Sequence, residues 1–226
     1  MANRGSKLCM QICVNNVEDD FDKKTGKIVR KSRKHLLDDL IGHGCINWLS
    51  PLAADSFKEY FLETIAKMYP AETRLDNMDW SFWISNIKPQ WDAIGIGSDN
   101  ALILVEAKAH TDEMESKKGC RAKGDSYLQI KEQIENIMGD DSVWLGKYYQ
   151  TANRILYLSK IKEYYGSSRN VVLVFLNFIN DVSLIPEAKE KWDEYLEKMK
   201  RKHPLPSSMT KYIKYIFMDI WKDKGL

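Results

Sequence analysis

Two carboxylates and a lysine near the middle of the chain have the spacing for phosphate chemistry. Thirteen residues separate Asp92 from Glu106, and Lys108 follows Glu106 by two positions. Carboxylates that face each other repel unless one is protonated or a cation lies between them. Mg²⁺ prefers carboxylate oxygens and keeps several of its waters. A neighbouring lysine can hold an attacking water or stabilise developing negative charge. These residues therefore predict a Mg²⁺ site, which Mn²⁺ would also fill, for hydrolysing a phosphate ester.

A β-hairpin over residues 89–110 would bring the three side chains together. Two apolar runs flank a turn at 97–100, whose Gly, Ser, Asp and Asn residues are typical of hairpin turns. With the turn centred on Asp99, Asp92 faces Glu106, and the lysine shares their face because side chains alternate along a strand. A two-residue turn would instead shift the pairing by one and put the acids on opposite faces.

The pattern of Asp92, thirteen residues and then Glu106-Ala107-Lys108 resembles the PD-(D/E)xK superfamily of restriction-endonuclease-like nucleases. The usual Pro-Asp is absent, because Trp91 precedes the aspartate. The resemblance implies that Asp92 and Glu106 bind Mg²⁺, that Lys108 assists the attacking water, and that a glutamate of a preceding helix completes the site. It covers about residues 55–180. The chain also resembles a group of uncharacterised bacterial proteins with this core. The resemblance lies in the strings Trp91-Asp-Ala-Ile-Gly, Leu104-Val-Glu-Ala-Lys-Ala-His and Tyr148-Tyr-Gln-Thr-Ala-Asn-Arg.

The third acid is expected on a helix at 57–68, capped by the Asp-Ser pair that precedes it. Glu59 and Glu63 both lie beside its apolar stripe. The string 61–66 resembles the first helix of several nucleases of the superfamily, where the glutamate after the aromatic pair faces the metal. That resemblance favours Glu63 as the third catalytic and metal-binding carboxylate. The alternative is an exposed helix carboxylate without a role.

Basic and polar side chains beyond the lysine strand are candidates for binding the substrate. The loop 116–124 carries four basic residues, and phosphates bind lysine and arginine regardless of sequence. An ordinary solvated loop is the alternative. A helix at 144–165 presents a polar face that would either bind a nucleotide or be hydrogen-bonded within the protein. The candidate substrate-binding residues are His110, Lys117, Lys118, Arg121, Gln150, Asn153 and Arg154.

Periodicity along the chain predicts one α/β domain over residues 1–226. We expect a single mixed sheet with helices on both faces and a restriction-endonuclease-like core of order α-β-β-β-α-β. That core spans about 55–180, with elaborations at 1–54 and 181–226. Residues 7–14 read as a short strand or ordered arm. The expected strands are 79–86, 91–97, 101–109, 170–178 and 212–221, and the expected helices are 35–41, 57–68, 126–138, 144–165 and 186–202.

Composition indicates the cellular compartment in which we expect the protein. The longest apolar run, Val171 to Leu176, is far shorter than a membrane span. No signal peptide is evident, and four cysteines without disulfide spacing indicate reduced thiols in a cytoplasm. We therefore expect a cytoplasmic protein with no membrane partner, and the resemblance implies that it is a bacterial enzyme.

The resemblance favours DNA over RNA as the partner and allows a homodimer. The expected function is thus a Mg²⁺-dependent endonuclease. A net charge of +2 does not by itself demand a polyanion. Two alternatives follow, because a fold alone does not give activity. One is a non-catalytic nucleic-acid-binding or regulatory protein on the same fold. The other is an enzyme that acts on a phosphate ester outside nucleic acids.

Overall fold

A five-stranded mixed sheet lies at the centre of the computed structural model, which describes residues 1–18, 20–21, 28–83, 88–139 and 142–222. Its strand order is β3-β6-β7-β8-β9. The pairs β3–β6 and β6–β7 are antiparallel, and β8 and β9 run parallel to β7. Two short ribbons, β1–β2 and β4–β5, lie outside this sheet. The strands are β1 Asp20–Phe21, β2 Ile28–Arg30, β3 Ile46–Ser50, β4 Tyr60–Phe61, β5 Gln90–Trp91, β6 Ala93–Gly97, β7 Leu102–Lys108, β8 Val171–Phe178 and β9 Ile213–Met218.

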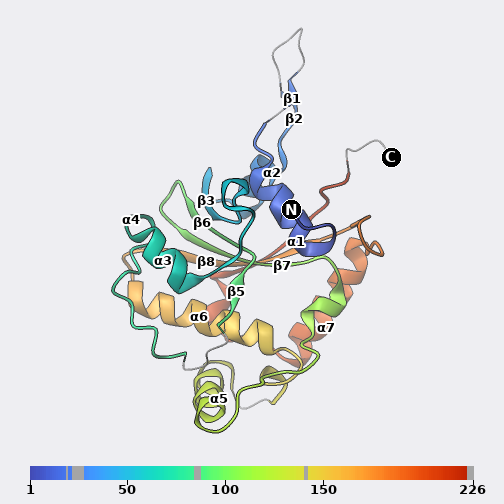
Figure 1. Cartoon of the computed structure of the whole chain (residues 1–226). Helices are drawn as coiled ribbons and strands as arrows, with labels where there is room; N and C mark the ends of the chain where they lie inside the picture. The colour runs from blue at the N-terminus through green and yellow to red at the C-terminus, as the bar shows by residue number, and fades with distance from the viewer. Residues whose placement is uncertain (19, 22–27, 84–87, 140–141, 223–226) are drawn as a thin grey trace.

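Helices cover both faces of the sheet (Figure 1). On one face lie α1 and α2, and on the other lies α6, with α5 packed against it on the side away from the sheet. No helix in the described part of the chain combines the length and apolarity needed to cross a membrane. The helices are α1 Gly5–Asn15, α2 Arg33–Ile41, α3 Leu62–Met68, α4 Pro70–Thr73, α5 Asp125–Met138, α6 Tyr149–Tyr165, α7 Lys189–Lys202 and α8 Ser207–Thr210, with short 3-10 helices at Ala53–Asp55, Thr111–Met114 and Ser142–Trp144.

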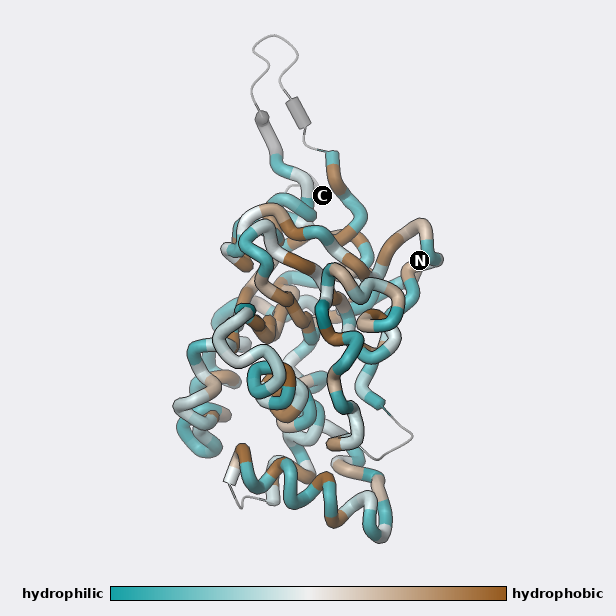
Figure 2. The backbone as a smooth tube through the Cα atoms, turned by 90° about the vertical axis from the view of Figure 1, so that its left-hand side faces the viewer, coloured by the Kyte–Doolittle hydropathy of each residue, from teal (hydrophilic) through white to brown (hydrophobic). Residues whose placement is uncertain are grey.

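The central strand β7 separates two hydrophobic cores. Ile103 and Val105 belong to the core beneath α1 and α2, whereas Leu102 and Leu104 belong to the core beneath α6. Every residue of β7 is buried, as expected for a strand covered on both sides. Figure 2 shows hydrophobic residues along the segments that make up the body of the molecule. Since side chains alternate, the polar end of β7 continues the α6 face.

The predicted hairpin and its register are confirmed. Ile94 pairs with Leu104 and Ile96 pairs with Leu102, which is the pairing expected from a turn centred on Asp99. The carboxylate of Asp99 accepts the Ala101 N–H at 3.1 Å and so closes the turn. This register leaves the residues just before β6 beside the last residues of β7.

The first core strand is not the predicted one. The partner of β6 is β3, and residues 79–83 form turns and irregular backbone, while 84–86 lie outside the described residues. The aromatic rings in 80–83 lie 5.1–6.4 Å from the ring of Tyr157 on α6. Their aromatic content therefore serves packing against a helix and not alternation across a sheet.

Two further elements differ from the expectation. The helix predicted at 57–68 begins only at Leu62, because Tyr60 pairs with Trp91 in the β4–β5 ribbon and cannot also be helical. Residues 7–14 lie within helix α1 and are not a strand. The buried Cys9 and Cys13 of α1 are spaced four apart, so they share one helix face.

Candidate active site

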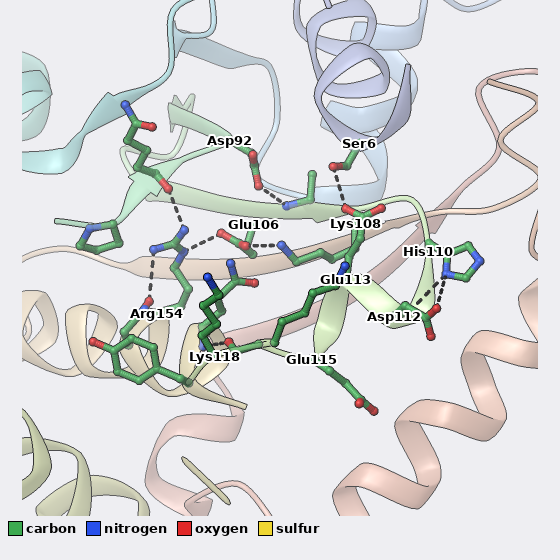
Figure 3. A pocket seen from close by; sticks show the side chains of 18 of the residues that line it. Ser6, Asp92, Glu106, Lys108, His110, Asp112, Glu113, Glu115, Lys118 and Arg154 are labelled. Carbon is green, nitrogen blue, oxygen red and sulfur yellow. Dashed lines mark hydrogen bonds and ion pairs between the residues drawn. The ribbon is translucent and has the colours of Figure 1, made fainter. Parts of the chain in front are cut away.

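The two predicted acids, Asp92 and Glu106, and Lys108 do meet at one end of the sheet. Glu106 and Lys108 project from the end of β7 on the α6 face, and Asp92 occupies the bend between β5 and β6 (Figure 3). The Asp92 carboxylate accepts the Ala107 N–H at 2.7 Å, which fixes it against β7. All three side chains line a cavity of about 1080 Å³. The hairpin thus brings the acids and the lysine to one cavity.

Glu106 is held between two cations. One carboxylate oxygen accepts from Lys108 Nζ at 2.6 Å and the other from Arg154 Nε at 2.6 Å. Only 3% of Glu106 is exposed. Burial would raise the pKa of Glu106, but Arg154 and then Lys108 outweigh it and lower the pKa. Burial would lower the pKa of Lys108, but Glu106 and then Asp92 raise it. Glu106 is therefore ionised and Lys108 protonated at neutral pH.

Arg154 connects α6 to the acidic site. Its Nη2 donates to the Gln90 carbonyl at 2.7 Å, and its guanidinium lies 4.7 Å from the Trp91 ring centroid. Figure 3 shows Arg154 reaching up from α6 to Glu106. Sequence reasoning placed Arg154 with the substrate-binding residues, and it does line the cavity. Its main partners, however, are the protein's own Glu106 and strand β5. Of the two roles expected for this polar helix face, Arg154 therefore has the one within the protein, as a hydrogen-bonded structural residue.

Asp92 is the group that the protein leaves poorly neutralised. Burial and the nearby Glu106 raise its pKa to about 7, against the lowering effects of Lys108 and the Ala107 N–H. One carboxylate oxygen accepts the Ala107 N–H. Within the described part of the chain, no hydrogen-bond donor reaches the other oxygen. The site therefore contains a carboxylate whose negative charge a bound cation would stabilise.

The donor set fits Mg²⁺ as a partly hydrated ion. The described residues contain no group of three or more His, Cys, Asp or Glu placed to hold a metal. Mg²⁺ nevertheless needs only one or two carboxylates when water and substrate phosphates supply its other ligands. Asp92 offers an oxygen without a donor, and each oxygen of Glu106 accepts one hydrogen bond and can accept a further contact. Two carboxylates facing one cavity are thus sufficient for such an ion.

The cavity contains Glu59 and not Glu63. Glu59 lines it, forms an ion pair with Lys7 at 3.2 Å and adds to the raised pKa of Asp92. Glu63 does not line the cavity; one of its oxygens pairs with Lys88, and the other is buried without a hydrogen-bond partner. The reason is the late start of α3, which leaves Glu59 in the extended segment that enters β4.

The basic loop lines another part of the same cavity. Its backbone is tied down where the N–H of residue 116 donates to the Lys147 carbonyl at 2.6 Å and that of Cys120 to the Leu145 carbonyl at 2.7 Å. Gly119, at φ +57°, allows this approach, because a Cβ there would lie 2.6 Å from the Leu145 oxygen. The loop's cavity-lining basic residues have no ion-pair partner among the described residues, and they are Lys117, Lys118 and Arg121.

The remaining candidates also line the cavity, with different surroundings. Gln150 is exposed and Asn153 is largely buried. His110 lies at the far end and contacts Glu187 at 2.7 Å through Nε2. Sequence reasoning assigned no role to Glu113, which accepts from the Ala109 N–H and from Ser6 of α1. The predicted substrate-binding residues therefore do surround one cavity.

Comparison of the chain with protein-family models, with curated proteins and with solved structures gave no match. The arguments for its function therefore come from the arrangement of these side chains.

Proposed function

We propose that the protein is a Mg²⁺-dependent nuclease that hydrolyses phosphodiester bonds in DNA. The observation that carries the proposal is one cavity with two chemically different walls. Asp92, Glu106 and Lys108 form the acidic wall, and the loop 116–121 forms a wall whose basic side chains have no ion-pair partner among the described residues. A phosphodiester backbone matches this arrangement, because basic groups hold phosphates while carboxylates bind the metal that acts on one of them.

The order of the elements supports the proposal. Three antiparallel strands, β3, β6 and β7, are followed by α5 and α6 and then by β8 parallel to β7. This agrees with the β-β-β-α-β part of the core that the PD-(D/E)xK resemblance implies. It departs from that core where α3 and α4 stand between the first and second strands.

Asp92 and Glu106 are the residues that would hold Mg²⁺. The bound ion would supply positive charge to a scissile phosphate and make a nearby water a better nucleophile. One oxygen of Asp92 receives no hydrogen bond from the described residues and so is available to the ion, and Arg154 holds Glu106 in place from α6. Glu59 adds negative charge at the cavity wall.

Lys108 is best suited to orient the attacking water and to stabilise developing negative charge. Its raised pKa keeps it as an ammonium, which donates hydrogen bonds and cannot accept a proton. It can hold the attacking water by its oxygen and stabilise negative charge that develops on the phosphate. Lys117, Lys118 and Arg121 bind the neighbouring phosphates and so position the strand.

One observation favours a second candidate, a DNA-binding protein without cleavage. Both oxygens of Glu106 already form 2.6 Å bonds to Lys108 and Arg154, so this acid is neutralised without a metal. In that case the same cavity would bind DNA phosphates and leave them intact.

Cleavage assays with labelled oligonucleotides and supercoiled plasmid, in Mg²⁺ and in EDTA, separate the two candidates. The nuclease proposal expects cleavage only with Mg²⁺, at least about 100-fold slower in Asp92→Asn and in Lys108→Met. Lys160→Met removes a lysine of α6 that does not line the cavity and is the matched control. DNA binding by the wild type without cleavage would support the second candidate. Equal cleavage by wild type and Asp92→Asn would refute the proposed site.

Calorimetric titration of Mn²⁺ gives an independent measurement. Binding should be present in the wild type and lost in Asp92→Asn. Identical titration curves would mean that the carboxylates do not hold a metal.

A further inference from the structure

A second cavity, of about 210 Å³, adjoins the candidate active site. The two cavities share several lining residues, among them Arg121, Tyr149 and Asn153. A ligand bound along the acidic wall can therefore extend a side group into the smaller cavity. At roughly 30 Å³ for each water, the smaller cavity has room for about seven waters, which is the size of one planar heterocycle and too small for a base pair.

The walls of this smaller cavity suit a flat, mainly apolar group. Trp83 is buried, and Pro89, Ala122 and Tyr149 are partly buried. Aromatic and proline side chains form flat surfaces against which the face of a ring can pack. Nucleobases are such rings, and every base has a π-face that can stack on an aromatic side chain.

One amide is placed to meet the polar edge of a base. Asn153 lines both cavities and is 7% exposed. Its Oδ1 accepts from Arg154 Nη1 at 3.2 Å. This bond fixes the orientation of the amide, and within the described part of the chain no acceptor takes the protons of its Nδ2. A ring nitrogen or carbonyl of a base can accept from it.

Arg121 stands where a backbone phosphate would join the two cavities. It lines both, is exposed, and has no ion-pair partner among the described residues. A guanidinium in this place can bind the phosphate between a base in the smaller cavity and the bond at the acidic wall.

We propose that the smaller cavity binds one unpaired nucleobase beside the phosphodiester bond at the acidic wall. The preferred substrate is then DNA with an unpaired nucleotide at that position, as in a single strand. The position relative to the cut bond rests on the proposed nuclease function, whereas the binding of the base requires no cleavage.

Fluorescence anisotropy in EDTA tests the binding of the base without cleavage. A labelled 12-nucleotide thymidine strand is compared with the same strand in a duplex, and with a set of strands that each lack one base. We expect the single strand to bind more tightly than the duplex. We also expect one abasic position to weaken binding by about 5- to 150-fold, the effect of losing one stacked base.

Tyr149→Leu should weaken binding of the intact strand by a similar factor and make that abasic position harmless. Tyr164→Leu is the matched control, since it removes an exposed tyrosine of the same helix that lines neither cavity. The abasic series uses the wild-type protein, so the test holds even if the Tyr149 variant does not fold.

Equal affinity for single strand and duplex, or equal binding of every abasic strand, would overturn the base cavity. Mg²⁺-dependent cleavage that persists in that case would leave the nuclease function standing. Abasic-sensitive binding without cleavage would do the opposite: it would refute the nuclease function and keep the base cavity.

Discussion

Replacing Arg154 by methionine should destabilise the fold far more than the loss of a surface charge would. Methionine keeps much of the length and removes the charge. Glu106 and Arg154 are 3% and 6% exposed and joined at 2.6 Å. Breaking a buried pair by removing one partner costs about 3–5 kcal/mol, because the other charge stays buried without full compensation. An exposed pair contributes only about 0–1 kcal/mol.

Urea unfolding of the wild type and of Arg154→Met measures this cost. For a chain of this size, the loss corresponds to a fall in Tm of roughly 6–20 °C. Lys160→Met, on the same helix and partly exposed, should change the free energy of unfolding by no more than about 0.5 kcal/mol.

Making Arg154→Met in a Glu106→Gln background identifies the physical cause of the lost stability. In Glu106→Gln the carboxylate charge is absent, so Arg154→Met should cost about 2–3 kcal/mol less than it does in the wild type. A loss below about 1 kcal/mol in the wild-type background would refute the buried-pair reasoning. An equal loss in both backgrounds would assign the cost to the contacts of Arg154 with Gln90 and Trp91 instead.

Three further predictions concern single positions around the cavity. The pKa of Asp92 is about 7 in the folded protein, against 3.8 for an aspartate in the unfolded chain. The contribution of Asp92 to stability is therefore complete below pH 4 and is lost as the pH rises through 7. Asp92→Asn, which can still accept the backbone N–H, should remove this fall and be more stable than wild type at pH 8; parallel urea midpoints at pH 5 and pH 8 would contradict it. Glu59→Gln should weaken Mn²⁺ binding at pH 8 by roughly tenfold, and Glu63→Gln should leave it unchanged; calorimetry giving the reverse would restore Glu63 as the third acid. Gly119→Ala should cost about 1–3 kcal/mol and weaken DNA binding, whereas Gly124→Ala, with a similar φ of +56° but open space around it, should cost less; equal losses in urea unfolding would show that the close approach is unimportant.

Local geometry explains what was predictable from the sequence. The turn residues at 97–100 and the two-residue period of a strand are properties of neighbouring residues. They predicted the hairpin, and with the turn centred on Asp99 they brought Asp92, Glu106 and Lys108 together, whereas the choice against a two-residue turn came from the structure. The apolar runs at 101–109 and 170–178 likewise indicated buried strands, which β7 and β8 confirm.

Packing between distant segments decided the features that local geometry did not predict. Arg154 reaches Glu106 across 48 positions of the chain, and no local period relates two such residues. Residues 79–83 have the composition of a strand, yet their aromatic side chains pack on α6, and β3 takes the place beside β6. The ribbon that Tyr60 forms with β5 delays α3 and puts Glu59 in the cavity. Given a turn centred on Asp99, the sequence alone thus determined which face the central acids and lysine share, because alternation is local. The tertiary structure determined which cation and which further acid join them, because that choice depends on the packing of the whole core.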